Sequence, residues 1–531
     1  MTTRATFSGF DTALSALQAN QKRLDITGQN LANMNTVGYT RQQLDTVSIA
    51  APTPGFYSTS PALGVGTGVR MTGVSQLHDP FLDNQYRLQM RKASSSDAFQ
   101  TTLDSLSSIL DETDIDGISK AFDDIQSTLT SMSDPSNVST SLFENELRSR
   151  MDKLAKLLNS TAADIENAKK TEYGRLNGSS SGNTGSIDQV NEMLTQIGEL
   201  NRQIKRQELF GQNPLELKDE RNRLLDELSG YIPIEVTYTN DKKYDSVDEL
   251  RVDLVYKNNQ GQTQKLTLID GTSGRDSENR GQLAISGGPD APKITVTTAA
   301  STATGTTTDD SKEFGKNTDN TLEGGSIAAG LEALISDGKN GGFRGYDYYM
   351  NQLDTLAQEF AKAINDCNNG NYGNNGSVTP NKGKELLDDG KGNPDPKKIT
   401  AANISVSEGW VNGTVHITMD DTTINQTVLD MLAAMKTPQT ALDNNTFTDF
   451  MNHVSTTLAN DSYNNSTTLK TNVTVLNGVQ NSRDSISGVS LDEEAANMMA
   501  YISAYNAASR LMTTLDEALD KLINGTGRVG L

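Results

Sequence analysis

Acidic residues in the segment "ETDIDGISKAFD" (112–123) have the spacing of a calcium-binding loop. Carboxylates at these offsets, with a glycine in sixth place, are what an EF-hand offers to Ca²⁺; the set is Glu112, Asp114, Asp116, Gly117 and Asp123. However, Asp123 is shorter than the glutamate that usually binds the ion through both oxygens, and Ser119 replaces an apolar anchor. An acidic start of a helix explains the same residues through the helix dipole. We therefore predict a helix start and no metal site.

Side chains that commonly act in catalysis are few and scattered. His78, His416 and His453 lie in unrelated segments, and no two of them have the spacing of metal ligands. Cys367 ends an apolar helical segment without a nearby histidine, so we expect an unreactive thiol. The sequence thus predicts no catalytic, cofactor-binding or metal-binding residue and favours a protein that is not an enzyme. The alternative, a secreted enzyme with an unrecognised site, would need ionisable groups that converge in a pocket.

Charge and hydropathy exclude two classes of partner. The 531 residues carry a formal net charge of -22 without a long run of Lys or Arg, so neither nucleic acid nor an anionic membrane is expected as a partner.

No apolar stretch approaches the ~20 residues that cross a bilayer. The first residues, "MTTRATFSGF", lack the apolar run of a secretory signal, which predicts either a cytoplasmic protein or export without a cleaved signal. A single cysteine excludes an internal disulfide.

The charges of "LELKDERNRLLDELSGY" (215–231) alternate with leucines at helical spacing. We interpret them as the solvated face of a helix that buries Leu217, Leu224, Leu225 and Leu228.

The strongest pattern lies in helices at the two ends of the chain, where apolar residues recur at alternating steps of three and four, as in a coiled-coil seam. The first set is Phe7, Phe10, Leu14, Leu17, Leu24 and Leu31; the second is Leu491, Ala495, Met498, Ile502 and Tyr505 and, after a shift of phase, Ala508, Met512, Leu515, Leu519 and Leu522. Ser490 and Glu493 have the spacing of a capping box at the start of the second helix. A narrow seam needs a partner helix. The pattern leaves open whether that partner lies in the same monomer or in another copy.

Between the ends, the period of the apolar residues changes twice. Residues with a period of two in "IPIEVTYT", "LRVDLVY", "QKLTLID" and "KITVTT" predict an antiparallel β-domain inserted between helical segments. The predicted parts are 1–80, with the first helix and the turn after it; 81–230, helical; 231–321, the β-domain; 322–480, helical, with a short strand-containing excursion at about 376–424; and 481–531, with the last helix. The fold class predicted is mainly α with inserted β, elongated and multi-domain.

The segment "ALSALQANQKRLDITGQNLANMNTVGYTRQQ" resembles the N-terminal signature of the bacterial flagellar axial proteins, the family of rod, hook and junction subunits. The matching residues are Asn30, Leu31, Ala32, Asn33, Asn35, Thr36, Gly38 and Tyr39. The segment "SGVSLDEEAANMMAYISAYNAASRLMTTLDEALDKLI" is similar to the C-terminal helix of the hook–filament junction members. In such a turn, asparagine side chains can satisfy backbone groups freed at the helix end, and Gly38 can adopt a positive φ.

The resemblance implies a fold and a function. The terminal helices would pair as a coiled coil in the inner layer of a tubular polymer, with the helical bundle domain in the next layer and the β-domain outward. The chain would be a secreted structural adaptor at the extracellular hook–filament junction, exported by the flagellar type III route. The implied partners are further copies in a tubular ring, the hook protein, the next hook–filament junction protein and an export chaperone at the C-terminal helix. A hook or distal-rod subunit is the alternative within the same family.

Overall fold

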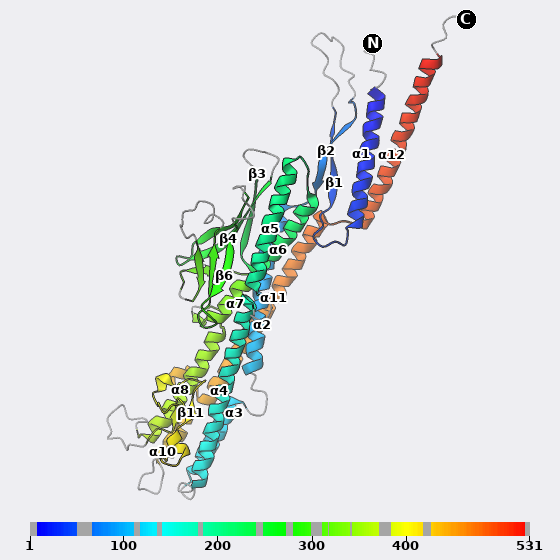
Figure 1. Ribbon diagram of the computed structural model, residues 1–531. Helices are drawn as coiled ribbons and strands as arrows, with labels where there is room; N and C mark the ends of the chain where they lie inside the picture. The colour runs from blue at the N-terminus through cyan, green and yellow to red at the C-terminus, as the bar shows by residue number, and fades with distance from the viewer. Residues whose placement is uncertain are drawn as a thin grey trace, which may run out of the picture.

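The chain forms a long rod of helices with β-sheets on one side, as the computed structural model in Figure 1 shows. The structure describes residues 8–49, 66–110, 117–134, 141–178, 184–240, 248–271, 280–298, 311–316, 318–339, 342–370, 384–417 and 426–525. In this part of the chain, no helix combines the length and the apolar character needed to cross a membrane.

Helices make up most of the described chain. They are α1 (Ser8–Ala32), α2 (Pro80–Leu110), α3 (Ile118–Met132), α4 (Ser141–Asn177), α5 (Ser186–Leu209), α6 (Leu215–Tyr231), α7 (Ser326–Ile335), α8 (Tyr346–Asn368), α9 (Glu408–Val411), α10 (Gln426–Lys436), α11 (Phe447–Ser487) and α12 (Leu491–Asp520), with the short turns η3 (Pro396–Lys398), η4 (Thr440–Leu442) and η5 (Lys521–Gly525). Local signals explain several ends; for example, α11 begins where the Thr446 hydroxyl accepts a hydrogen bond from the Asp449 N–H at 3.2 Å.

The strands form small antiparallel sheets. β1 (Gln42–Ser48) pairs with β2 (Val69–Gln76) in a ribbon beside α1. One larger sheet contains β3 (Ile234–Asn240), β4 (Asp248–Asn258), β5 (Thr263–Asp270) and β9 (Asn320–Leu322), and another contains β6 (Gln282–Ser286), β7 (Lys293–Thr297) and β8 (Lys312–Gly315). β10 (Leu387–Asp388) and β11 (Ser405–Val406) form a short pair near the far end of the rod.

A continuous apolar core runs through the helices between α2 and α11 and into the larger sheets. Near the far end it contains Phe122, Phe360 and Phe447, whose ring centroids lie 5.3–5.6 Å apart. The thiol of Cys367 lies in the same core, and burial raises its pKa, so the prediction of an unreactive cysteine agrees with its position.

An ion-pair cluster attaches the β-sheets to the helices. The ammonium group of Lys169 on α4 lies 2.9 Å from Asp290, in the connection between β6 and β7, and 2.7 Å from Asp347 on α8. Lys316, beside β8, also contacts Asp347 at 2.7 Å. Lys169 is 6% exposed, so these contacts offset the cost of burying its charge.

Several predictions can be compared with these elements. The mainly α-helical fold with inserted antiparallel β-structure is confirmed, and each predicted strand of the β-domain is present. The helix predicted after the acidic segment begins at Ile118; Glu112, Asp114 and Asp116 lie outside the described residues, and Asp123 accepts a hydrogen bond from Thr448 at 3.2 Å. The domain boundaries remain predictions.

Two local features differ from the sequence analysis. The ribbon of β1 and β2 was not predicted, because its strands lie far apart in the sequence and mix polar with apolar residues. The capping box at α12 does not form: Ser490 is the N-cap residue, but its side chain makes no capping hydrogen bond. Glu493, the other half of that box, contacts Arg41 instead.

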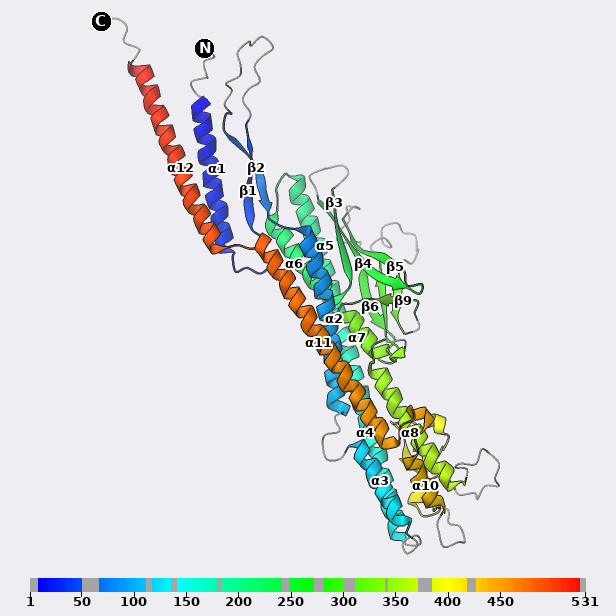
Figure 2. The same cartoon turned by 180° about the vertical axis from the view of Figure 1, so that it is seen from behind.

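Both terminal helices lie at one end of the rod, side by side (Figures 1 and 2). Leu515 of α12 lies so close to Gly9 of α1 that a Cβ at Gly9 would be 3.3 Å from its side chain. Near the middle of the pair, the guanidinium group of Arg23 lies over the ring of Tyr501, 5.6 Å from its centroid.

Candidate functional site: the joint between the terminal helices and the body

The turn after α1 and the connection from α11 to α12 meet where the terminal helices join the rest of the rod. We call residues 30–42 and 487–494 together the joint. Asn30 is 1% exposed and pairs with the backbone of Gln42: its amide donates to the Gln42 carbonyl, and its Oδ1 accepts from the Gln42 N–H, both at 3.0 Å. The Tyr39 hydroxyl donates to the same Oδ1 at 2.9 Å. Asn30 thus fixes the start of β1 against α1.

The turn itself is held by short-range hydrogen bonds. The Asn33 side chain donates to the Gln29 carbonyl at 3.0 Å, and the Asn33 backbone N–H donates to the same carbonyl at 3.1 Å. The Thr36 N–H donates to the Asn33 carbonyl at 2.9 Å, and Gly38 has φ +82°. The positive φ expected for Gly38 is therefore present, whereas Asn33 adds a second donor to a carbonyl that the helix already pairs. The other signature residues, Leu31, Ala32 and Asn35, are half-buried or exposed.

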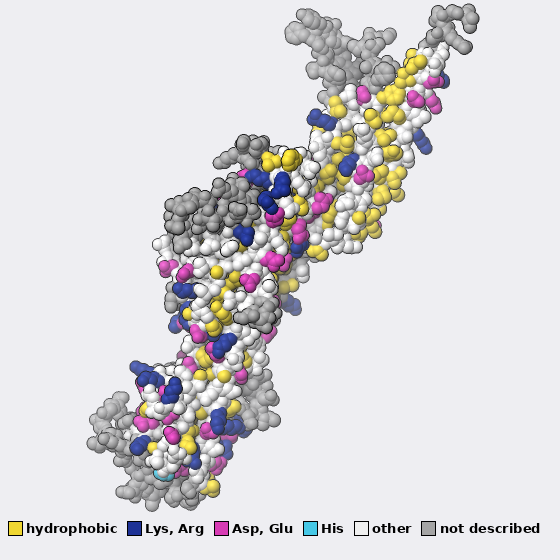
Figure 3. Space-filling model, viewed as in Figure 1, with side chains coloured by type: hydrophobic (Ala, Val, Ile, Leu, Met, Phe, Trp, Pro, Cys, Tyr) yellow, Lys and Arg dark blue, Asp and Glu magenta, His cyan; other side chains and the backbone are white. Residues whose placement is uncertain are grey.

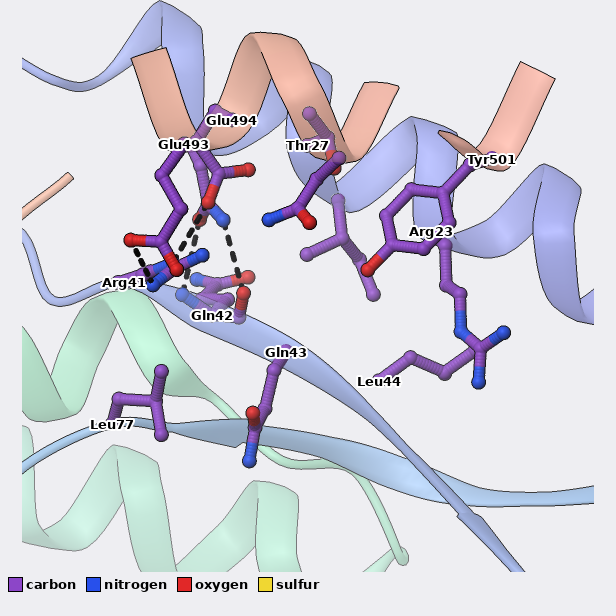
Figure 4. A pocket seen from close by; sticks show the side chains of 13 residues that line it. Arg23, Thr27, Arg41, Gln42, Gln43, Leu44, Leu77, Glu493, Glu494 and Tyr501 are labelled. Carbon is purple, nitrogen blue, oxygen red and sulfur yellow. Dashed lines mark hydrogen bonds and ion pairs between the residues drawn. The ribbon is translucent and has the colours of Figure 1, made fainter. Parts of the chain in front are cut away.

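Arg41 connects the two halves of the joint (Figure 4). Its Nε lies 2.7 Å from Glu494 and its Nη1 lies 3.1 Å from Glu493, while its backbone N–H donates to the Ser487 carbonyl at 2.8 Å. Glu494 is 2% exposed, whereas the Glu493 side chain is 58% exposed. Since both glutamates lie in the first turn of α12, they also interact favourably with its helix dipole. This contact fixes α12 to the strand that follows α1.

Asp219 of α6 attaches the joint to the body. Its carboxylate accepts the Thr40 N–H at 3.2 Å, and the residue is 7% exposed. Burial raises the pKa of Asp219 to about 6; the Thr40 hydrogen bonds oppose this shift, and the charge of Glu216 adds to it. The interpretation of 215–231 as a helix with all charges in solvent is wrong here, because Asp219 and Arg221 are both buried.

Replacing Asp219 with asparagine is expected to stabilise the protein at neutral pH. The pKa of Asp219 in the folded state lies above its ordinary value of 3.8. Between about pH 4 and pH 6 the folded state therefore retains a proton that the unfolded state loses. The contribution of Asp219 to the free energy of unfolding falls as the pH rises through this range. Asparagine keeps an acceptor for Thr40 and cannot ionise. We expect a gain of roughly 1–3 kcal/mol at pH 7.5 and almost none at pH 4.

Thermal unfolding of Asp219→Asn and the unchanged protein at both pH values measures this difference. A variant that is less stable at pH 7.5, or a gain that is equal at both pH values, would contradict the assignment.

A second ion-pair cluster holds the end of α11 to the body. Arg483 contacts Asp226 of α6 at 2.6 Å and Asp83 of α2 at 3.0 Å, and Asp226 also contacts Arg87 at 2.8 Å. Although burial disfavours its charge, the hydrogen bond from His78 and the guanidinium groups of Arg483 and Arg87 hold the pKa of Asp83 below its ordinary value. His78 contacts Asp83 at 3.0 Å in this cluster.

The joint encloses a polar cavity of about 410 Å³ beside Arg41, whose lining includes Thr27, Gln42, Glu494 and Tyr501 (Figure 4). The lining residues include neither histidine nor cysteine, and the described residues contain no cluster of three or more potential metal ligands. Both glutamates in the cavity wall contact Arg41, so their charges are already partnered.

The predicted seam residues of α1 lie on a partly covered face. Phe10, Leu17, Leu24 and Leu31 are half-buried, Leu14 is 46% exposed, and Phe7 lies outside the described residues. The buried residues of α1 are instead Ala13, Ala19, Asn20, Ile26, Thr27 and Asn30. Apart from Ile26, the residues of α1 that the monomer buries thus have small or polar side chains.

The seam residues of α12 divide between two faces. The less exposed positions form one series with steps of four and three: Glu494, Met498, Tyr501, Tyr505, Ala508, Met512, Leu515 and Leu519. The predicted residues Leu491, Ile502 and Leu522 lie outside this series and are 51%, 45% and 55% exposed, and Ala495 is also exposed. We call the side of α12 that carries the exposed residues Leu491, Met499 and Ile502 the outer face; Leu511, Leu522 and Ile523 are exposed as well. Figure 3 shows apolar side chains along this end of the rod. Contacts of these residues with other copies remain a prediction.

Sequence comparisons identify known families and proteins that are similar to this chain. A family model described as the flagellar hook-associated protein FlgK helical domain matches residues 103–386, more than half of the chain. Models of the flagella basal body rod protein and of the flagellar basal body rod FlgEFG protein C-terminal region match 10–40 and 480–525.

Two curated relatives are named flagellar hook-associated protein 1. The one from Bacillus subtilis (strain 168) is 28% identical over 98% of this chain and 99% of its own length, and the one from Escherichia coli (strain K12) is 25% identical over 96% and 98%. The solved structure of the flagellar hook junction protein FlgK from Burkholderia pseudomallei matches 57% of this chain and 46% of that chain, with 20% identity and a TM-score of 0.42.

Proposed function

The chain belongs to the flagellar hook-associated protein family defined by the FlgK helical domain, and from this premise we propose that it self-assembles at the hook–filament junction as an adaptor that connects hook to filament. It is a structural protein of the flagellum, and the enzyme alternative is set aside because its relatives are structural hook-associated proteins. The outer face of α12 is the observation that carries self-assembly. Its residues Leu491, Met499 and Ile502 lie on one side of the helix and are 45–65% exposed, so we infer that neighbouring copies cover them.

The proposed arrangement follows the shape of the rod. We propose that α1 and α12 pair as a coiled coil in the inner layer of a tube, with the helical segments 81–230 and 322–480 in the next layer. The side-by-side position of the terminal helices supports this proposal. We also propose that the β-domain, 231–321, points outward; its position on one side of the rod is consistent with that. The joint would set the angle between these layers.

The partners proposed are further copies of the chain in a ring, the hook protein, and the next hook–filament junction protein. An export chaperone would bind the C-terminal helix before secretion, since an exposed apolar helix face needs a cover in the cell as well. The proposed location is extracellular, between hook and filament.

Deleting the gene and restoring it on a plasmid tests the function. Cells without the protein are expected to build hooks, to lack filaments, and to release filament protein into the medium. Cells that also lack hooks would favour the alternative, a hook or distal-rod subunit, for which the matches at 10–40 and 480–525 give some support. Cells that keep filaments and swim would contradict both assignments.

A further inference from the structure

The contact between α2 and α11 is apolar at one end of the helix pair and polar at the other. The two helices lie against each other in opposite directions, from Leu103 and Leu458 in the core to Asp83 and Arg483 at the joint. The buried residues of α11 are Phe447, Phe450, Met451, Val454 and Leu458, all in its first turns. Within the described residues 459–487, none is buried. We call 459–487 the upper half of α11; the apolar core does not hold it.

Hydrogen bonds of two asparagines hold the upper half on α2. Asn465 donates to the Ser96 carbonyl at 2.9 Å and to the Gln100 side chain at 3.0 Å. Asn472 donates to the Ser96 hydroxyl at 3.0 Å and accepts from Gln89 at 3.2 Å, while the Asn472 carbonyl accepts from the same Gln89 amide at 3.0 Å. Ser96 and Gln89 are 7% and 8% exposed, so these bonds lie inside the contact between the helices.

The asparagines occupy equivalent positions of a repeat. They are seven residues apart, and Leu469 and Leu476 alternate with them at steps of four and three, all half-buried. On α2 the facing residues Gln89, Ala93, Ser96 and Gln100 follow the same steps. An asparagine at such a seam position lowers stability but specifies how two helices pair, because an amide that loses its partner is costly to bury.

We propose that Asn465 and Asn472 are positioning residues that hold the upper half of α11 on α2 in one orientation. The apolar core fixes the lower end of α11 and the ion pairs of Arg483 fix its upper end, so the packing of the helix between Leu458 and Arg483 is left to the seam. Leucines can turn or slide past one another with little change in burial, since apolar contact is not directional. The amides can be satisfied only where Ser96, Gln89 and Gln100 meet them. Because only residues 488–490 separate α11 from α12, this orientation sets the point at which α12 starts at the joint.

The proposal concerns the chain alone and does not depend on its function in the flagellum. Its test is the double variant Asn465→Leu, Asn472→Leu, which makes four successive seam positions leucine. Spin labels would be attached after Thr101→Cys on α2 and Thr474→Cys on α11, both exposed, in a Cys367→Ala background. Pulsed electron paramagnetic resonance then gives the distance distribution between the labels. With both asparagines present, we expect one narrow distribution.

The double leucine variant leaves the Gln89 amide and the Ser96 side chain without their partners on the asparagine side chains, so its melting temperature is expected to fall modestly. Its distance distribution is expected to broaden or to gain a second maximum about 5 Å away, the rise of one helical turn. The matched control is Asn464→Leu, Asn477→Leu, on the exposed side of the same helix, and it should leave the distribution unchanged.

A single narrow distribution in the double leucine variant, equal to that of the unchanged seam, would overturn the proposal. Equal broadening in Leu469→Ala, which lowers stability at the same seam and keeps both asparagines, would also overturn it, because it would assign the asparagines to stability rather than to orientation.

Discussion

Replacing Met499 and Ile502 with glutamate is expected to abolish assembly at the junction while leaving the melting temperature of the monomer unchanged within about two degrees. These side chains of the outer face are 65% and 45% exposed, so the new carboxylates stay in water in the monomer and cost little. If neighbouring copies cover the outer face, each unpaired carboxylate would cost several kcal/mol there. Cells with this variant should build hooks, release filament protein into the medium and fail to swim.

Two controls are needed: one for the effect of added negative charge and one for the amount of protein that is exported. Asn452→Glu, Thr456→Glu places the same charges on exposed positions of α11 in the body and should leave swimming intact. The variant protein must also be measured inside cells and in the medium, because a lost chaperone contact would reduce secretion. A Met499 and Ile502 variant that is secreted and still supports filaments would show that the outer face is not an assembly surface.

Replacing Glu494 with alanine is expected to detach the start of α12 from the joint. Glu494 is 2% exposed and Arg41 lies 2.7 Å from it, so the substitution leaves a partly buried guanidinium group with only the exposed Glu493 as a partner. Losing one partner of a buried pair costs several kcal/mol, and about 2 kcal/mol is expected here because Arg41 keeps some solvent access. In hydrogen exchange this corresponds to roughly 30-fold faster opening of the first turns of α12.

Glu493→Ala is the matched control, since it removes the other carboxylate at the same guanidinium group from a 58% exposed position. An exposed pair of this kind contributes about 0–1 kcal/mol to stability. In Glu493→Ala, hydrogen exchange in the first turns of α12 should therefore become less than about fivefold faster. Equal effects of the two substitutions would mean that burial of Glu494 does not hold the joint.

The parts of the site that depend on local chemistry could be predicted from the sequence. Gly38 has the expected positive φ, because the end of a helix and a tight turn impose it locally. The inserted strands could likewise be predicted from a period of two over short segments. The partner of Asn30 was not specified, since its bonds reach the backbone of Gln42 across a chain reversal.

Contacts between distant segments could not be predicted. Arg41 and Glu494 lie at opposite ends of the sequence, and Asp219 has the sequence context of an exposed helical charge although the joint buries it. The less exposed series on α12 includes Glu494 and Tyr501. A search for apolar residues did not follow this series from its start and needed a shift of phase. It therefore selected Leu491 and Ile502, which the monomer leaves exposed. A pattern of apolar residues does not distinguish a face covered within the monomer from one available to another copy.

The location of the protein on intact flagella tests the central claim most directly. Gold-labelled antibody against this chain should bind in a single band where the hook meets the filament, in every flagellum of the producing bacterium. Labels distributed along the hook or the filament, or confined to the rod after membrane removal, would contradict an adaptor at the junction.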